Sequence, residues 1–119
     1  MAMNIYKQQI LDHYRNPRNY RKIADYNASA RLTNTTCGDE IEMYLRVKDG
    51  KVEDIGFQGS GCALSIACSS MLTELVQGLP LARVELLGEK EIEEMVGQVN
   101  PGRKKCVMLP LEVLKAAVI

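Results

Sequence analysis

The stretch EIEMYLRVKDGKVEDIGFQG constrains the fold more than any other part of the chain, because it encodes two neighbouring β-strands. Apolar and polar residues alternate along its first half, which is the pattern of a strand with one buried face. The residues expected on the buried face are Ile41, Met43, Leu45 and Val47, and those expected on the other face are Glu42, Tyr44, Arg46 and Lys48.

The centre of this stretch predicts a tight hairpin. Asp49–Gly50 suits a type I′ turn, since glycine accepts the positive φ that such a turn demands. In the returning strand, from about Lys51 to Gln58, Ile55 and Phe57 share a face and Val52 is out of phase with them. We therefore expect either a β-bulge near Glu53–Asp54 or an early start of the strand.

Helical patterns surround the hairpin. A first amphipathic helix is expected to stop at Asn16–Pro17, because the residue before a proline avoids the α region. A strand is expected to begin near Ala28, and apolar spacing predicts a helix from Ala63 to Gln77, closed by Gly78. Short helical segments are expected in LPLARVELLG and EKEIEEMVGQV, and a longer one in VMLPLEVLKAAVI. The last helix is expected to start close to Cys106–Val107, so that Pro110 falls in its first turn.

This order of elements predicts one α+β domain spanning residues 1–119, with helices packed on one face of a small antiparallel β-sheet. The 119 residues suit a single core.

The 15 basic and 15 acidic residues cancel, so bulk charge supports neither a nucleic-acid nor a membrane partner. The N-terminus has no apolar signal region, and no apolar run approaches the roughly 18 residues of a membrane span.

A cytoplasmic, reducing location is expected, and it shapes the interpretation of the four cysteines. In such a compartment cysteines act as metal ligands, reactive thiols or core residues more often than as disulfide partners. Cys68 lies on the apolar stripe of its helix and is interpreted as a small buried hydrophobe. Cys37, Cys62 and Cys106 lie instead at turns, the last two beside predicted helix starts.

Helix starts favour thiolates, because the macrodipole and unpaired N–H groups there stabilise negative charge. Lys104 and Lys105 add positive charge beside Cys106. Gly59 and Gly61 would let the backbone approach a bound group near Cys62 without an intervening Cβ.

Asp39 follows Cys37 by two residues, so that three thiolates and one carboxylate would supply the four ligands of tetrahedral zinc or of a [2Fe–2S] cluster. Alternatives stay open at this point. The chain has no C-x-x-C pair, the three cysteines could be unrelated loop thiols, and an aspartate in a turn is often a cap. Glu40 is interpreted as a solvated strand residue. The single histidine, His13, is interpreted as a packing or capping residue, which leaves a cysteine–histidine hydrolase without support.

Four stretches of the sequence, taken together and in chain order, resemble a known protein family. ILDHYRNPRNY, TTCGDEIEMYLRV, GFQGSGCALSIACSSMLTELVQG and KKCVMLPLEVLKAA together resemble the U-type iron–sulfur cluster scaffold proteins, namely IscU, SufU and the N-terminal domain of NifU. The resemblance covers nearly the whole chain and implies their α+β scaffold fold. It also implies that Cys37, Asp39, Cys62 and Cys106 are the ligands.

The resemblance implies a scaffold and sulfur acceptor rather than an enzyme. A cysteine desulfurase would deliver persulfide sulfur, with Cys37 or Cys106 as the first acceptor. Iron and electron donors would complete a [2Fe–2S] cluster, which then passes to acceptor proteins. The main rival is a zinc-bound, SufU-like sulfur acceptor that activates a desulfurase through the same residues. A third reading is a plain interaction domain whose cysteines are incidental.

Two departures from the IscU pattern matter. Lys105 stands where IscU-type proteins carry a histidine before the third cysteine, and a protonated lysine cannot ligate a metal, so the fourth ligand falls to Asp39. VNPGR stands where those proteins carry the L-P-P-V-K motif, so a dedicated Hsp70-type chaperone partner is not carried over. The short interval before Cys106 resembles IscU, whereas Lys105 resembles SufU.

Overall fold

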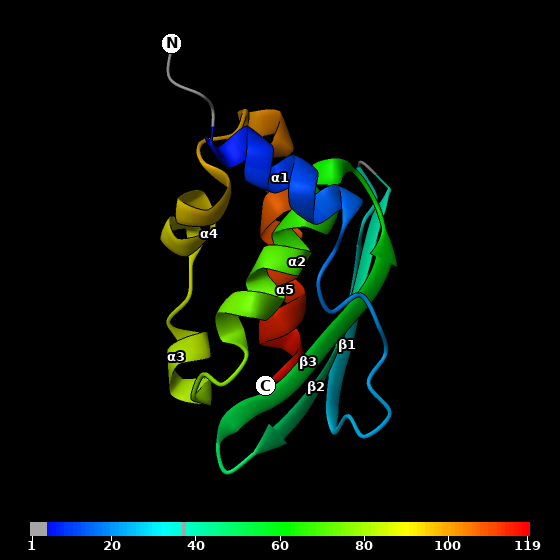
Figure 1. Cartoon of the computed structure of the whole chain (residues 1–119), viewed down its shortest axis with the longest axis vertical. Helices are drawn as coiled ribbons and strands as arrows, with labels where there is room; N and C mark the ends of the chain where they lie inside the picture. The colour runs from blue at the N-terminus through cyan, green and yellow to red at the C-terminus, as the bar shows by residue number, and fades with distance from the viewer. Residues whose placement is uncertain (1–4, 37) are drawn as a thin grey trace.

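The computed structural model describes residues 5–36 and 38–119 of the chain (Figure 1). The elements follow the predicted order of helix, sheet and helices. They are α1 (Ile5–Arg15), β1 (Ala28–Asn34), β2 (Asp39–Lys48), β3 (Lys51–Ser60), α2 (Ala63–Val76), α3 (Leu81–Glu85), α4 (Glu89–Val96), the 3₁₀ turn η1 (Pro101–Arg103) and α5 (Lys104–Ala117).

The three strands form one antiparallel sheet in the order β1-β2-β3. The helices lie on one side of it, as Figure 1 shows, with α5 against β1 and β2 and with α2 against β3. Ile41, Met43 and Leu45 of β2 are fully buried in the core between the two layers. The predicted α+β architecture with helices on one face is therefore confirmed.

Tyr44 departs from the alternation expected along β2. The sequence places it on the polar face, yet its side chain is 4% exposed. The cause lies in the segment that precedes β1, because the ring of Tyr26 packs edge-on against Tyr44 with centroids 5.3 Å apart. The ammonium group of Lys22 lies 5.5 Å from the centre of the Tyr44 ring. The far side of β2 is thus partly covered by non-helical chain.

The hairpin between β2 and β3 forms as predicted. Asp49 and Gly50 both have positive φ, 54° and 72°, as a type I′ turn requires. Arg46 pairs with Asp54 and Val47 pairs with Val52, which leaves Glu53 as the extra residue of a β-bulge. The predicted bulge is therefore confirmed, and it explains why Val52 is out of phase with Ile55 but still fully buried.

The predicted start of the last helix is wrong. Helix α5 begins at Lys104, directly after η1, and Pro110 lies in its interior rather than in its first turn. Pro110 has no N–H to donate to the carbonyl of Cys106, which disfavours a helix at this point. The helix nevertheless continues, because Leu111, Val113 and Leu114 beyond the proline are buried in the core. Tertiary packing outweighs the local cost.

None of the helices in the described part of the chain is long and apolar enough to cross a membrane.

His13 is the one buried residue among the described residues of α1, and it holds this helix against α2. Its Nδ1 lies 2.7 Å from the Ser70 hydroxyl and its Nε2 lies 3.7 Å from the Glu74 carboxylate. The interpretation of His13 as a packing residue is confirmed.

Candidate metal centre

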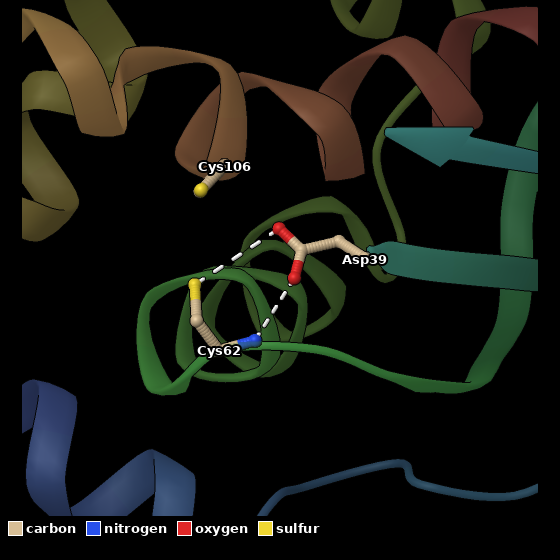
Figure 2. Close-up of side chains that lie close together, drawn as sticks. All are labelled: Asp39, Cys62 and Cys106. Atoms are coloured by element: carbon tan, nitrogen blue, oxygen red, sulfur yellow. Dashed lines mark hydrogen bonds between the residues drawn. The ribbon is translucent and has the colours of Figure 1, made fainter. Parts of the chain in front are cut away.

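Three side chains from distant parts of the sequence meet at one end of the molecule. Asp39 is the first residue of β2, Cys62 is the N-cap of α2, and Cys106 lies in the first turn of α5. One carboxylate oxygen and the two sulfur atoms all lie within 4.8 Å of one another. Figure 2 shows the three side chains converging from the strand and the two helix starts.

The sheet and the short β3–α2 connection create this meeting point. Glu40 of β2 pairs with Ser60 of β3, so the start of β2 lies beside the end of β3. Two residues after Ser60 the chain reaches Cys62 and turns into α2. Helix α5 packs against both β2 and α2, which brings its first turn to the same end.

Asp39 is fully buried and is held by the backbone of α2. Its Oδ1 accepts a hydrogen bond from the Cys62 N–H at 2.9 Å, and its Oδ2 lies 4.0 Å from the Cys62 sulfur (Figure 2). The carboxylate therefore satisfies one of the N–H groups at the helix start, where negative charge is stabilised. One carboxylate oxygen is anchored, and the other faces the sulfur.

Gly61 makes this contact sterically feasible. A Cβ at residue 61 would lie 2.5 Å from Asp39 Oδ1 and 2.5 Å from the Ser65 hydroxyl oxygen, so any side chain would displace one or both. Gly59 has a different role, because a Cβ there would lie 2.1 Å from the Glu40 carbonyl oxygen. Gly61 thus admits the Asp39 carboxylate and Gly59 admits the neighbouring strand, while the approach of a bound group to either glycine stays a prediction.

The family model "NifU-like N terminal domain" matches residues 5–119. The chain belongs to the iron–sulfur cluster assembly scaffold family of IscU, SufU and NifU. The resemblance seen in the four sequence blocks is confirmed.

Individual members of this scaffold family show how far the likeness extends. "Iron-sulfur cluster assembly scaffold protein IscU 1" of Archaeoglobus fulgidus is 35% identical over 115 residues, which cover 97% of this chain and 75% of the relative. "Zinc-dependent sulfurtransferase SufU" of Bacillus subtilis is 31% identical over 132 residues, covering 96% and 89%. A crystal structure titled as that of a hypothetical protein matches with a TM-score of 0.80 at 32% identity, covering 96% of both chains.

The cysteines differ sharply in environment. Cys62 is half-buried, and Cys106 is 2% exposed. Cys68 is fully buried in the core, where burial raises the pKa of its thiol from 9.0 to about 12 and its sulfur lies 3.2 Å from the Val107 carbonyl oxygen. The interpretation of Cys68 as a buried hydrophobe is confirmed. Cys37, which the sequence places among the ligands, lies outside the described residues.

The two lysines before Cys106 are not equivalent. The ammonium group of Lys104 forms an ion pair of 2.6 Å with the Glu89 carboxylate, and this hydrogen bond raises the pKa of Lys104. Lys104 thus has a carboxylate partner in Glu89, and the effect of the two lysines on Cys106 stays a prediction. Lys105 is exposed. Glu40 is half-buried and pairs with Arg31 at 3.0 Å, in keeping with a strand-face role.

Ser65 is the residue of this centre that the sequence interpretation missed. It lies in the first turn of α2 and is fully buried, with its hydroxyl 3.1 Å from the Cys62 carbonyl oxygen and 3.8 Å from the Cys62 sulfur. A signal exists, because residues three apart at a helix start lie on one face. The spacing from Cys62 to Ser65 has that form, but a serine in a first turn is too common to stand out.

The donor set fits a thiophilic metal. In a tetrahedral zinc site with zinc–sulfur bonds of about 2.3 Å, neighbouring ligand atoms lie about 3.8 Å apart. Closing the observed 4.8 Å arrangement around one ion requires movements of about 1 Å. Two iron atoms span a larger space, so the same residues also suit a small cluster. Thiolates favour zinc and iron–sulfur clusters, whereas a carboxylate is the harder and weaker ligand of this set.

Proposed function

We propose that this protein is a scaffold on which a [2Fe–2S] cluster is assembled and from which it passes to acceptor proteins. The cluster is the cargo of the reaction rather than a resident cofactor. Its sulfur comes as persulfide from a cysteine desulfurase, and its iron and electrons come from separate donors. Cys37, Asp39, Cys62 and Cys106 are the proposed ligands. The observation that carries the proposal is the convergence of Asp39, Cys62 and Cys106 at two helix starts and a strand start.

Mixed ligation explains why such a site would release its cargo. Cys62 and Cys106 offer soft sulfur donors that bind iron strongly, whereas Asp39 offers a hard oxygen. Oδ1 of Asp39 also accepts the Cys62 N–H, so the carboxylate shares its electron density between the backbone and the metal. The Asp39 bond is therefore the weakest link to the cluster and the first that an acceptor's thiolate would replace.

Sulfur transfer requires a thiolate of this chain to attack the outer sulfur of the desulfurase persulfide. The new S–S bond forms on this chain as the old one breaks, the desulfurase leaves as a thiolate, and no net oxidation occurs. Cys37 and Cys106 are the proposed first acceptors. Because Cys106 is 2% exposed, its sulfur would be reached only after the first turn of α5 moves. Alkylation trapping followed by mass spectrometry locates the persulfide, and a label found on Cys62 alone would overturn both assignments.

A zinc-bound form is the second candidate function. Three ligand atoms within 4.8 Å suit a single ion as well as a cluster, and the Bacillus subtilis relative is named a zinc-dependent sulfurtransferase. In this form zinc would stay at the site, and the protein would accept sulfur and activate the desulfurase without holding iron.

Anaerobic purification with iron, sulfide and zinc counts distinguishes the two. The scaffold proposal predicts a coloured protein with about two irons and two sulfides per cluster and thiolate-to-iron absorption in the visible region. A colourless protein with one zinc per chain supports the second candidate. A protein that takes up neither under reconstitution with iron, sulfide or zinc would overturn both.

Replacing Asp39 tests its role in release. Asp39→Ala removes the hard ligand, and a thiol in the buffer can then fill its position with a softer sulfur donor. We therefore expect the cluster to persist several-fold longer and to transfer more slowly to an apo-ferredoxin. The measurement is the decay of visible absorbance with and without the acceptor. Glu40→Ala is the matched control, since it removes the adjacent carboxylate, which pairs with Arg31 instead. A cluster in Asp39→Ala that lasts no longer than in the unmodified protein would show that Asp39 does not govern release.

A further inference from the structure

Ser65 occupies a position that the ligand set alone does not explain. Its hydroxyl is fully buried although it lies in the first turn of α2, where a serine could face solvent. Ser69, one turn further along, is also fully buried, but its hydroxyl donates to the Ser65 carbonyl at 2.8 Å. Both hydroxyls thus donate to a carbonyl of the same helix, but that of Ser65 also lies 3.8 Å from the Cys62 sulfur of the candidate metal centre.

Two groups of Cys62 lie around this hydroxyl, and Asp39 lies nearby across Gly61. Ser65 Oγ donates to the Cys62 carbonyl at 3.1 Å and lies 3.8 Å from the Cys62 sulfur. The missing side chain of Gly61 leaves a space that Ser65 Oγ and Asp39 Oδ1 border together, since each lies 2.5 Å from the position of a Cβ. Ser65 therefore contacts Cys62 and borders the space that holds Asp39.

We propose that Ser65 is a positioning residue that donates a hydrogen bond to the sulfur of Cys62 when this cysteine binds metal. The inference rests on the proposed function and concerns how the same site holds its metal. A metal-bound cysteine has lost its proton, so within this pair the hydroxyl becomes the donor and the sulfur the acceptor. Rotation about the Cβ–Oγ bond of Ser65 moves the hydroxyl hydrogen from the Cys62 carbonyl toward the Cys62 sulfur. No covalent bond forms or breaks.

Two effects follow from such a hydrogen bond. It fixes the position of the Cys62 sulfur, which otherwise depends on rotation about the Cα–Cβ bond of that side chain alone. It also withdraws electron density from the thiolate, and hydrogen bonds to ligand sulfurs are one of the factors that set the properties of iron–sulfur centres. Partners of metal ligands typically change metal affinity by about 10–100-fold when they are removed.

The test uses zinc and cobalt as probes of the whole 119-residue chain. Zinc affinity is measured by competition with a chelator, and Co²⁺ reports on the ligands through its sulfur-to-cobalt charge-transfer band. Ser65→Ala should weaken zinc binding about tenfold. It should also shift the charge-transfer band to longer wavelength, because a thiolate without the hydrogen bond gives up an electron more readily. Ser69→Ala should leave both quantities unchanged, and Ser65→Thr, which keeps a hydroxyl, should restore them.

The outcomes separate this inference from the proposed function. If the unmodified protein binds neither metal, the proposed function fails and the role of Ser65 fails with it. If it binds both while Ser65→Ala keeps the affinity and the band position, the role of Ser65 alone is overturned. A crystal structure of the zinc-loaded, unmodified protein gives a test independent of variant folding. The proposal requires the distance from Ser65 Oγ to Cys62 Sγ to be shorter than 3.8 Å, and a longer distance contradicts it.

Discussion

Helix α2 carries two cysteines fewer than two turns apart, and they lie in opposite chemical environments. Cys62 is the N-cap, half-buried, beside a buried carboxylate and a hydroxyl. Cys68 is fully buried, its pKa is raised to about 12 by burial, and its sulfur faces the carbonyl of Val107. The same side chain thus lies in the candidate metal centre at the start of the helix and packs in the core at its middle.

The difference shows that position along a helix decides what a cysteine can do here. The first turn supplies N–H groups that stabilise negative charge, and the β3–α2 connection supplies the space for Asp39. The middle of the helix offers apolar neighbours and one backbone acceptor. Three experiments test this contrast between the start and the middle of α2.

The largest expected effect is on thiol reactivity. At pH 8 a thiol with a pKa of about 12 has roughly a thousandfold less thiolate than one with the ordinary value of 9.0, so Cys68 should alkylate about a thousandfold more slowly in the folded protein than in denaturant, and much more slowly than the half-buried Cys62. Mass spectrometry of the metal-free protein after timed exposure to iodoacetamide measures both rates. In denaturant the two rates should become similar. Native rates within tenfold of each other would contradict the contrast.

The next effect concerns the space beside Cys62. Gly61→Ala should force Asp39 away from the Cys62 N–H and lower zinc affinity about 10–100-fold, as loss of a ligand-supporting contact does. Gly102→Ala is the matched control, since a Cβ there meets no atom within 4 Å. Chelator competition on both variants gives the comparison. Equal affinity in the two variants would show that the Asp39 contact does not matter for metal binding.

The smallest effect is on the pH dependence of folding. The folded state keeps the proton of Cys68 up to about pH 12, whereas the unfolded chain loses it near pH 9.0. The unfolded state therefore binds fewer protons in this window, and the free energy of unfolding should fall with rising pH by about 1 kcal/mol per unit through this group. Urea titrations of the unmodified protein and of Cys68→Ala at pH 8 to 11 isolate the effect. Parallel slopes in the two proteins would contradict the assignment.

Local patterns predict much of this fold. The hairpin at Asp49–Gly50, the bulge at Glu53 and the helix that starts after Cys62 all follow from turn chemistry and periodicity, which act within a few residues. The errors arise where long-range packing decides. Pro110 is tolerated inside α5 because that helix lies against the sheet, and Tyr44 is buried because Tyr26 packs on it.

In the candidate site, too, local sequence indicates some features and long-range packing decides the others. Residue types and turn positions single out Cys37, Cys62 and Cys106, with Asp39 as a weaker candidate, but spacing in sequence leaves unrelated loop thiols as an alternative until the family blocks are considered. The approach of Asp39, Cys62 and Cys106 to within 4.8 Å depends on the pairing of β2 with β3 and on the packing of α5. The space at Gly61 shared by Asp39 and Ser65 depends on the same packing, and no local pattern indicates it.

X-ray absorption spectroscopy of the zinc-loaded protein tests the central claim most directly. The account predicts one zinc per chain with three sulfur ligands at about 2.3 Å, from Cys37, Cys62 and Cys106, and one oxygen at about 2.0–2.2 Å, from Asp39. Cys62→Ala should lose one sulfur from this shell, and Cys68→Ala should keep all three. A zinc shell with fewer than three sulfurs, or one unchanged by Cys62→Ala, would contradict the proposal that these residues form a single metal centre.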